Sequence, residues 1–185
     1  MTSIHIRTAR LDLIPATIAF LHSDREDRQT LARLLHAAIP SAWPPALLDD
    51  ETLGEFIRMM ADHSDPNFIS WYWVRDDPAC GERVLIGSGG TASSPAAEDT
   101  VLIGYSVLEE FQGQGYATEA VQHLIPAIFT LPGIQRIVAT TYPHLPASIQ
   151  VLQKCGFVYS GETSSGEGIE EGTLVYVLEN PDDRA

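Results

Sequence analysis

The sequence has few cysteines, few basic residues and no long apolar run, and each shortage excludes a class of protein. Two cysteines, Cys80 and Cys155, are too few for a disulfide framework, so we expect reduced thiols in a cytoplasmic protein. The chain has only 11 basic residues against 25 acidic ones. The resulting formal charge of −14 argues against a nucleic-acid partner. No stretch reaches the roughly 18 apolar residues of a membrane span, and no signal peptide leads the chain. We therefore expect no membrane partner. The six histidines have no ligand spacing, so no metal site is predicted.

The remaining composition is that of a soluble domain, and the 185 residues are predicted to form a single domain over residues 1–185. Apolar alternation predicts a first strand over residues 4–14, ended by Pro15, and two short helices over residues 16–38. The prolines of residues 39–45 exclude regular structure there, and Asp49 to Glu51 are expected to cap a following helix. The later elements are predicted as strands over residues 68–74, 83–88, 101–107, 134–141, 157–162 and 172–178, a loop over residues 91–99, and helices from Ala117 and from Ser148 to Cys155.

The most informative stretch runs from Val101 to Phe129, where a strand turns through glycines into a helix. The turn reads Gln112-Gly-Gln-Gly-Tyr-Ala117, and apolar residues at three- and four-residue steps follow it. A helix N-terminus leaves backbone amides unpaired, and its dipole adds partial positive charge. Glycine lets the backbone approach a ligand closely. The pattern therefore predicts an anion site that suits a phosphate group.

Two common phosphate-binding motifs do not fit this turn. A dinucleotide fingerprint needs a third glycine where the chain has Thr118, and the acidic ribose partner about twenty residues later is missing. A Walker-type loop needs Gly-Lys-Ser/Thr, which is also absent. The predicted anion site is therefore of another kind.

Three segments resemble the GNAT acetyltransferases. The turn is similar to motif A of that family, with Gln112, Gly115 and Ala117 at the matching places, and Lys154-Cys-Gly-Phe157 resembles the end of its second conserved helix. The opening, Arg7 to Leu13, is similar to the first strand of the ribosomal-protein N-acetyltransferase branch. The resemblance implies an α/β fold with a mixed sheet, splayed at its centre and covered by helices on both faces.

The resemblance also implies acetyl-CoA as co-substrate. The pantetheine arm is expected to lie in the splay as an added strand, and the pyrophosphate is expected on the amides of the turn. The residues implied in acetyl-CoA binding are Ser106, Val107, Leu108, Gln112, Gly113, Gln114, Gly115, Tyr116, Ala117 and Ser148.

The implied chemistry is direct attack of a neutral amine on the acetyl thioester. It needs a base, a donor for the tetrahedral oxyanion and an acid for the leaving thiolate. The Val107 amide is the implied oxyanion donor. The tyrosine that commonly serves as acid is replaced by Leu152, and Ser148 stands where the ribosomal-protein branch uses a serine. A helix-capping role for Ser148 stays open. Leu145 replaces the asparagine that often touches the cofactor arm, and His144 is a candidate substitute.

The base and the acceptor are not identified by the sequence. Glu109 and Glu110 follow the central strand, and Trp73 and Tyr105 are candidates to line the acceptor cleft or to lie in the core. Residues 20–65, expected to cover that cleft, have no family likeness. Two hypotheses follow: an N-acetyltransferase acting on a protein N-terminus or a small amine, and a noncatalytic acyl-CoA-binding protein of the same fold. A homodimer is left open as the assembly.

Overall fold

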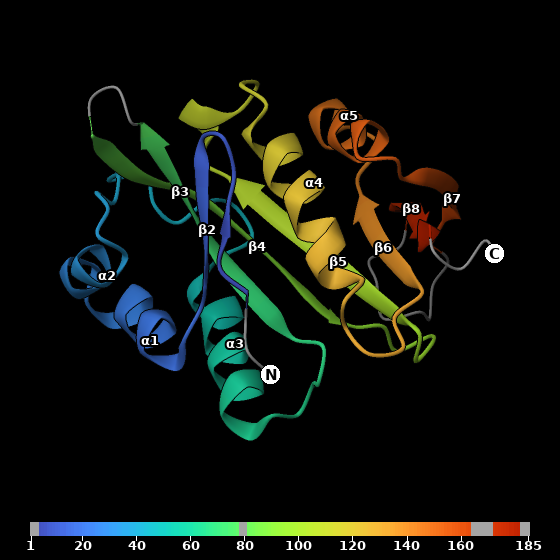
Figure 1. The fold of residues 1–185 in the computed structure, drawn as a ribbon, viewed down its shortest axis with the longest axis horizontal. Helices are drawn as coiled ribbons and strands as arrows, with labels where there is room; N and C mark the ends of the chain where they lie inside the picture. The colour runs from blue at the N-terminus through green and yellow to red at the C-terminus, as the bar shows by residue number, and fades with distance from the viewer. Residues whose placement is uncertain (1–3, 78–80, 164–171, 182–185) are drawn as a thin grey trace.

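The computed structural model describes residues 4–77, 81–163 and 172–181, drawn as a coloured ribbon in Figure 1. Its helices are α1 (Ile18–Glu26), α2 (Arg28–Leu35), α3 (Asp50–Asp62), the short 3₁₀ turn η1 (Glu109–Phe111), α4 (Tyr116–Ile128) and α5 (Pro146–Lys154). Its strands are β1 (Ile6–Arg7), β2 (Leu11–Pro15), β3 (Ile69–Asp77), β4 (Glu82–Ser93), β5 (Thr100–Val107), β6 (Arg136–Thr141), β7 (Val158–Glu162) and β8 (Leu174–Glu179). The predicted mixed α/β class is confirmed.

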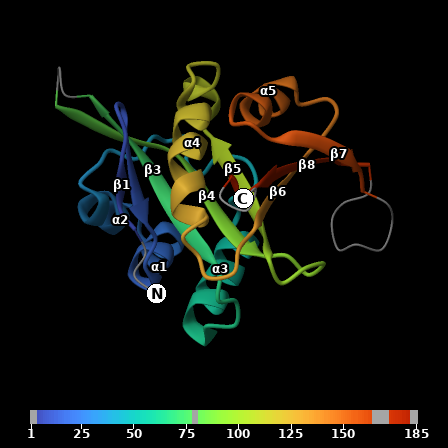
Figure 2. The same ribbon diagram turned by 45° about the vertical axis from the view of Figure 1, so that its right-hand side comes forward.

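Among the described residues, eight strands form one sheet in the order β1-β2-β3-β4-β5-β6-β8-β7. All neighbours are antiparallel except β5 and β6, which are joined by the crossover helix α4 and run parallel. Helices α4 and α5 pack on one face over Trp71 and Trp73, whereas α1, α2 and α3 pack on the other over Tyr72. In both ribbon views α4 crosses the strands on the near side (Figure 2). Helices therefore cover both faces, as predicted, because alternate residues of β3 point to opposite sides.

The central sheet opens between β5 and β6. Pairing between them covers only Thr100 to Leu102 on β5, against Arg136 to Val138 on β6, although β5 continues to Val107. On its other edge β5 stays paired with β4 up to Val107. The second half of β5 therefore has one edge without a partner strand, and this is the predicted splay.

Several predicted strand boundaries were wrong, and β3, for example, continues to Asp77 beyond the predicted end at residue 74. The first strand is a hairpin of β1 and β2, because Thr8 and Leu11 exchange hydrogen bonds and turn the chain. Strand β4 continues to Ser93, where a loop was predicted from Thr91. Its glycines allow close packing: a Cβ on Gly89 would lie 2.5 Å from the Trp73 ring. The glycines before residue 91 therefore let β4 pack against a large side chain, and the strand continues into the segment predicted as a loop.

The predicted cap before α3 was confirmed, and two more helix ends have a local cause. Asp49 caps α3 by accepting from the Thr52 amide, and Gly156 ends α5 with a left-handed φ of +88°. Helix α4 ends two residues after Pro126. No helix among the described residues is long and apolar enough to cross a bilayer.

Candidate functional site

The turn before α4 has the conformation that an anion site needs. Gly113 and Gly115 have φ angles of +72° and +84°, a region that residues with a side chain rarely adopt. Nothing lies within 4 Å of the position that a Cβ on Gly113 would take. The residues from Gln112 to Gly115 are exposed, so the backbone of the turn is open to a ligand.

The amides of this turn are unpaired. Gly115 starts α4 without a side-chain cap, and the first hydrogen bond of the helix runs from the Glu119 amide to the Gly115 carbonyl. Within the described ranges, none of the six amides of residues 113–118 donates a hydrogen bond to the protein. Successive free amides at a helix N-terminus are the donors that a phosphate requires. The turn therefore fits the pyrophosphate of acetyl-CoA.

The side chains of the two glutamines of the turn donate hydrogen bonds to nearby backbone carbonyls. The Gln112 Nε2 group donates to the Val107 carbonyl at 2.8 Å, and the Gln114 Nε2 group donates to the Glu110 carbonyl at 3.0 Å. The Gln112 amide donates to the Glu109 carbonyl. The Gln112 side chain thus connects the turn to the end of β5, and the Gln114 side chain connects it to η1. The amides left for a ligand begin at Gly113.

The last residues of β5 differ in what they offer at the open edge. The Leu108 amide donates to the Ile86 carbonyl, and the Leu108 carbonyl accepts from the Phe111 amide, so both of its main-chain groups are occupied. Because antiparallel pairing alternates, the Ser106 amide then points to β4 and the Val107 amide points to the open edge. Of the three, Val107 has the amide that faces the splay.

Ser148 lies in the first turn of α5 and is half-buried. Helix α5 has no side-chain cap, and among the described residues the Ser148 hydroxyl makes no regular hydrogen bond to the backbone. Its neighbour is the buried Tyr105 hydroxyl, which lacks a hydrogen-bond partner of normal geometry. Burial raises the pKa of Tyr105 to about 12, with the Ser148 hydroxyl opposing the rise. Two hydroxyl groups from β5 and α5 therefore face each other across the splay.

The positions that depart from the family pattern differ in their burial. Leu152 is 1 % exposed and belongs to the core under α4, as does Trp73, which stacks on Tyr105 with ring centroids 6.2 Å apart. Leu145 is exposed, and the neighbouring His144 ring stacks on Tyr142. Trp73 is thus a core residue, and the usual acid position holds a buried apolar side chain.

Arg10 and Glu119 join the turn to the β1–β2 hairpin and were not singled out from the sequence. Glu119 accepts hydrogen bonds from the Thr8 hydroxyl at 2.6 Å and from Arg10 Nε at 2.7 Å. Burial would raise the pKa of Glu119, but these bonds outweigh it and the pKa is lowered. The available signal was the family-like opening, Arg7 to Leu13, in which Thr8 and Arg10 stand.

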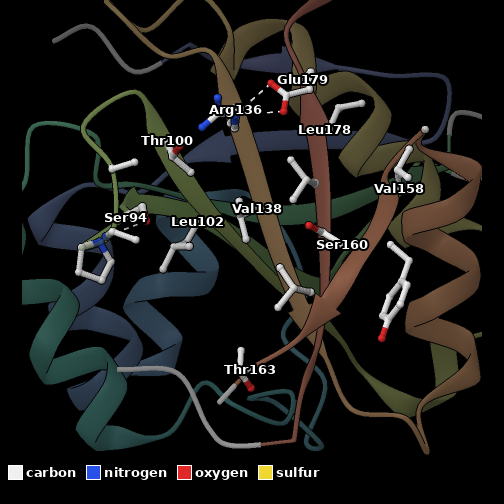
Figure 3. A pocket seen from close by; sticks show the side chains of 17 residues that line it. Ser94, Thr100, Leu102, Arg136, Val138, Val158, Ser160, Thr163, Leu178 and Glu179 are labelled. Atoms are coloured by element: carbon white, nitrogen blue, oxygen red, sulfur yellow. Dashed lines mark hydrogen bonds and ion pairs between the residues drawn. The ribbon is translucent and has the colours of Figure 1, made fainter. Parts of the chain in front are cut away.

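A large hollow lies elsewhere. A cavity of about 660 Å³ is lined by Leu102, Val138, Val158 and neighbouring residues of β5, β6, β7 and β8 (Figure 3). Leu102 and Val138 alternate with residues that are buried under α4, so the cavity is on the opposite face of the sheet. It lies where β5 and β6 pair, and none of residues 106–117 lines it. Size alone therefore does not locate the site.

Comparison with known proteins agrees with this geometry. The family model of the acetyltransferase (GNAT) domain matches residues 5–158. The chain belongs to the GNAT acetyltransferase family. Among curated GNAT-type relatives, an FsC-acetyl coenzyme A-N(2)-transacetylase of Aspergillus fumigatus is 26 % identical over 180 residues, which cover 94 % of this chain and 75 % of the relative.

Solved GNAT structures with the same fold include enzymes of the ribosomal-protein branch. A ribosomal-protein-S5-alanine acetyltransferase from Vibrio fischeri superposes with a TM-score of 0.67 at 19 % identity, covering 97 % of this chain and 98 % of that one. RimL, an α-N-protein acetyltransferase solved with coenzyme A, superposes with a TM-score of 0.65 at 19 % identity, covering 96 % and 98 %. The predicted family, its likeness to that branch and the GNAT fold are confirmed.

Proposed function

We propose that the protein is an N-acetyltransferase that moves the acetyl group of acetyl-CoA to a primary amine, either a protein N-terminus or a small amine. The observation that carries the proposal is the row of six unpaired amides from Gly113 to Thr118, beside the open edge of β5. A turn that offers donors without acceptors, next to an unpaired strand edge, suits a ligand with a pyrophosphate and an amide-bearing arm. Acetyl-CoA is such a ligand.

The acetyl-CoA contacts are divided among the elements that meet at the splay. The amides from Gly113 to Ala117 hold the pyrophosphate, and Gln112 fixes the turn to β5. At the edge of β5 near Ser106, the Val107 amide is the main-chain donor left for the thioester end of the arm. The Gln112 side chain occupies the Val107 carbonyl, and the Leu108 main-chain groups are also occupied.

In the reaction the Val107 amide donates to the oxygen that becomes negative as the amine attacks. The Ser148 hydroxyl and the free amides of α5 stabilise the departing thiolate, with the Tyr105 hydroxyl behind Ser148. The acceptor enters from the face covered by α1, α2 and α3, which packs against Leu108 at the end of β5. The cytoplasmic location, the homodimer and the single domain over residues 1–185 stay predictions.

Cofactor binding tests the turn. Gly115→Glu adds bulk and negative charge where the pyrophosphate is expected, and we expect calorimetry to detect no acetyl-CoA binding to the folded variant. Gly133→Glu is the matched control, because Gly133 is also exposed, has a φ of +77° and has nothing within 4 Å of its Cβ position. It introduces the same strain and charge away from the turn and should bind normally. Unchanged affinity in a folded Gly115→Glu variant would remove the turn from the cofactor site.

A noncatalytic acyl-CoA-binding protein is the second candidate. Leu152 favours it, because this residue is buried in the core where the family commonly presents a tyrosine. Release of free thiol in the presence of amines and peptide N-termini separates the two functions. Both should bind acetyl-CoA, but only the enzyme releases thiol at a rate that depends on an acceptor. Binding without any such release across a broad panel would favour the second candidate.

A further inference from the structure

Arg10 contacts the cofactor turn from the β1–β2 hairpin, which is more than a hundred residues away in the chain. Its Nη1 group donates to the Gln114 carbonyl at 3.0 Å, and its Nε group donates to Glu119 at 2.7 Å. The guanidinium also lies 4.4 Å from the centre of the Tyr116 ring. One side chain therefore holds a carbonyl of the turn, the first aromatic residue of α4 and a carboxylate of its first helical turn.

The contact with Gln114 controls a group that would oppose an anion. The turn offers free amides, but its carbonyl oxygens carry partial negative charge. Arg10 holds the Gln114 carbonyl in a charge-assisted hydrogen bond, which is stronger than a neutral one. This fixes the peptide between Gln114 and Gly115, and with it the direction of the Gly115 amide.

The contact with Glu119 compensates a charge beside the turn. The Glu119 side chain is only 13 % exposed, and its carboxylate accepts three hydrogen bonds, from the Thr8 hydroxyl, the Arg10 amide and Arg10 Nε. The lowered pKa of this carboxyl keeps it ionised at neutral pH. A partly buried negative charge in the first turn of α4 would repel a pyrophosphate. Arg10 offsets that charge through an ion pair in which its Nε atom lies 2.7 Å from a Glu119 carboxylate oxygen.

One nitrogen of the same guanidinium remains free. In the part of the chain that the structure describes, Arg10 Nη2 makes no hydrogen bond, and it lies 3.5 Å from the position that a Gly115 Cβ would take. A guanidinium has five N–H donors in a fixed fork, so the two bonds already made hold Nη2 in place. Positive charge is thus kept next to the space that Gly115 leaves open, in a protein whose formal charge is −14.

We propose that Arg10 is a positioning residue of the pyrophosphate site: through the Gln114 carbonyl and Glu119 it sets the turn for an anion. This rests on the proposed function, since it assumes that acetyl-CoA is the ligand of the turn. It also gives the family-like opening of the chain a physical reason. The hairpin between β1 and β2 delivers a cation to a turn that has no basic residue of its own between Gln112 and Ala117.

The test compares two forms of the acetyl donor. Acetyl-CoA carries the pyrophosphate, whereas S-acetylpantetheine has the same thioester arm without it. For Arg10→Gln we expect acetyl-CoA affinity to fall about tenfold or more, while kcat/KM with S-acetylpantetheine stays within about twofold of wild type. Arg136→Gln is the matched control, because the Arg136 side chain is equally exposed at 44 % and its Nε also pairs with a glutamate, Glu179, far from the turn. It should change neither value.

The outcomes separate this proposal from the proposed function. Wild-type protein that does not bind acetyl-CoA would refute the proposed function itself. Wild-type binding with an unaffected Arg10→Gln variant would refute only the role of Arg10. Equal losses with both donors would also refute it, because a merely structural brace affects the whole site.

Should Arg10→Gln not fold, Arg10→Lys keeps the charge but loses the planar fork that reaches Gln114 and Glu119 together. The expected result is again a loss confined to acetyl-CoA. Acetyl-CoA binding by Arg10→Lys equal to that of wild type would overturn the positioning role.

Discussion

Replacing Ser148 by alanine distinguishes a catalytic hydroxyl from a structural one. Ser148 stands in the first turn of α5, where a serine often caps the helix, and losing such a cap costs about 1 kcal/mol of stability. The structure shows no capping hydrogen bond from this side chain within the described residues. We therefore expect the free energy of unfolding to change by less than about 0.5 kcal/mol.

The expected effect on the rate is much larger. If the Ser148 hydroxyl donates to the departing sulfur, its loss removes a contact made only in the transition state, which lowers turnover by a factor of about 10² to 10⁴. Acetyl-CoA affinity should change little, because most cofactor contacts are main-chain groups of the turn. A serine hydroxyl is a weak acid, so it needs a partner. Tyr105 is placed for that role, since its buried hydroxyl adjoins Ser148, and the burial that raises its pKa keeps the phenol protonated.

Single-turnover kinetics, acetyl-CoA titration and a melting curve measure the three quantities on one variant. Tyr105→Phe should lower the rate as well, and the double variant with Ser148→Ala should lose less than the product of the two single losses, because the groups act together. Ser160→Ala, an exposed serine on β7, is the control and should leave all three quantities unchanged. An unchanged single-turnover rate in Ser148→Ala would refute the catalytic role, whatever the melting curve shows.

Two further predictions concern stability and reactivity. Burial raises the pKa of the Cys155 thiol to about 11, so in a Cys80→Ser background a thiol reagent should label native protein slowly and unfolded protein fast; fast native labelling would contradict this. Burial alone would raise the pKa of Asp12, but the hydrogen bonds from Arg83 and His5 outweigh burial and leave the pKa lowered. The ionised Asp12 therefore stabilises the fold above its ordinary pKa of 3.8, and this stability is lost as the pH falls below that value. Asp12→Ala should lower the free energy of unfolding by about 3 kcal/mol in denaturant at neutral pH, and it should make that free energy depend less on pH below about 4. A pH dependence equal to that of wild type in this range would refute the role of Asp12.

The order of the elements and the glycine turn before α4 could be predicted because their signals are local. Glycine at positive φ, an uncapped helix start and apolar periodicity can all be read within a few residues of Gly115. The length of β4 could not be predicted, because its glycines are explained by contacts across the sheet. Gly89 is packed against Trp73 and Gly90 against the Ile69 carbonyl, and both partners are on β3.

The pairings that the sequence does not show depend on contacts between distant segments. Arg10 reaches Gln114 across more than a hundred residues of chain, and Tyr105 meets Ser148 only because α5 follows the splayed strand β6. No spacing in the sequence encodes either pair. Cys80 lies outside the described residues.

The splay and the turn combine into a site with a definite polarity. At the end of β5 the Gln112 side chain occupies the Val107 carbonyl, whereas the Val107 amide points to the open edge without a partner among the described residues. Beyond it, the amides from Gly113 onward are also free. The site therefore offers the Val107 amide as a donor and, further along the chain, the amides of the turn. The Val107 carbonyl, the nearest acceptor, is already bound by Gln112. We infer that this arrangement selects a ligand whose oxygens face the protein, first a thioester carbonyl and then a pyrophosphate. At the thioester carbonyl, the oxygen gains negative charge during the reaction. A free donor beside it therefore stabilises the transition state more than the ground state.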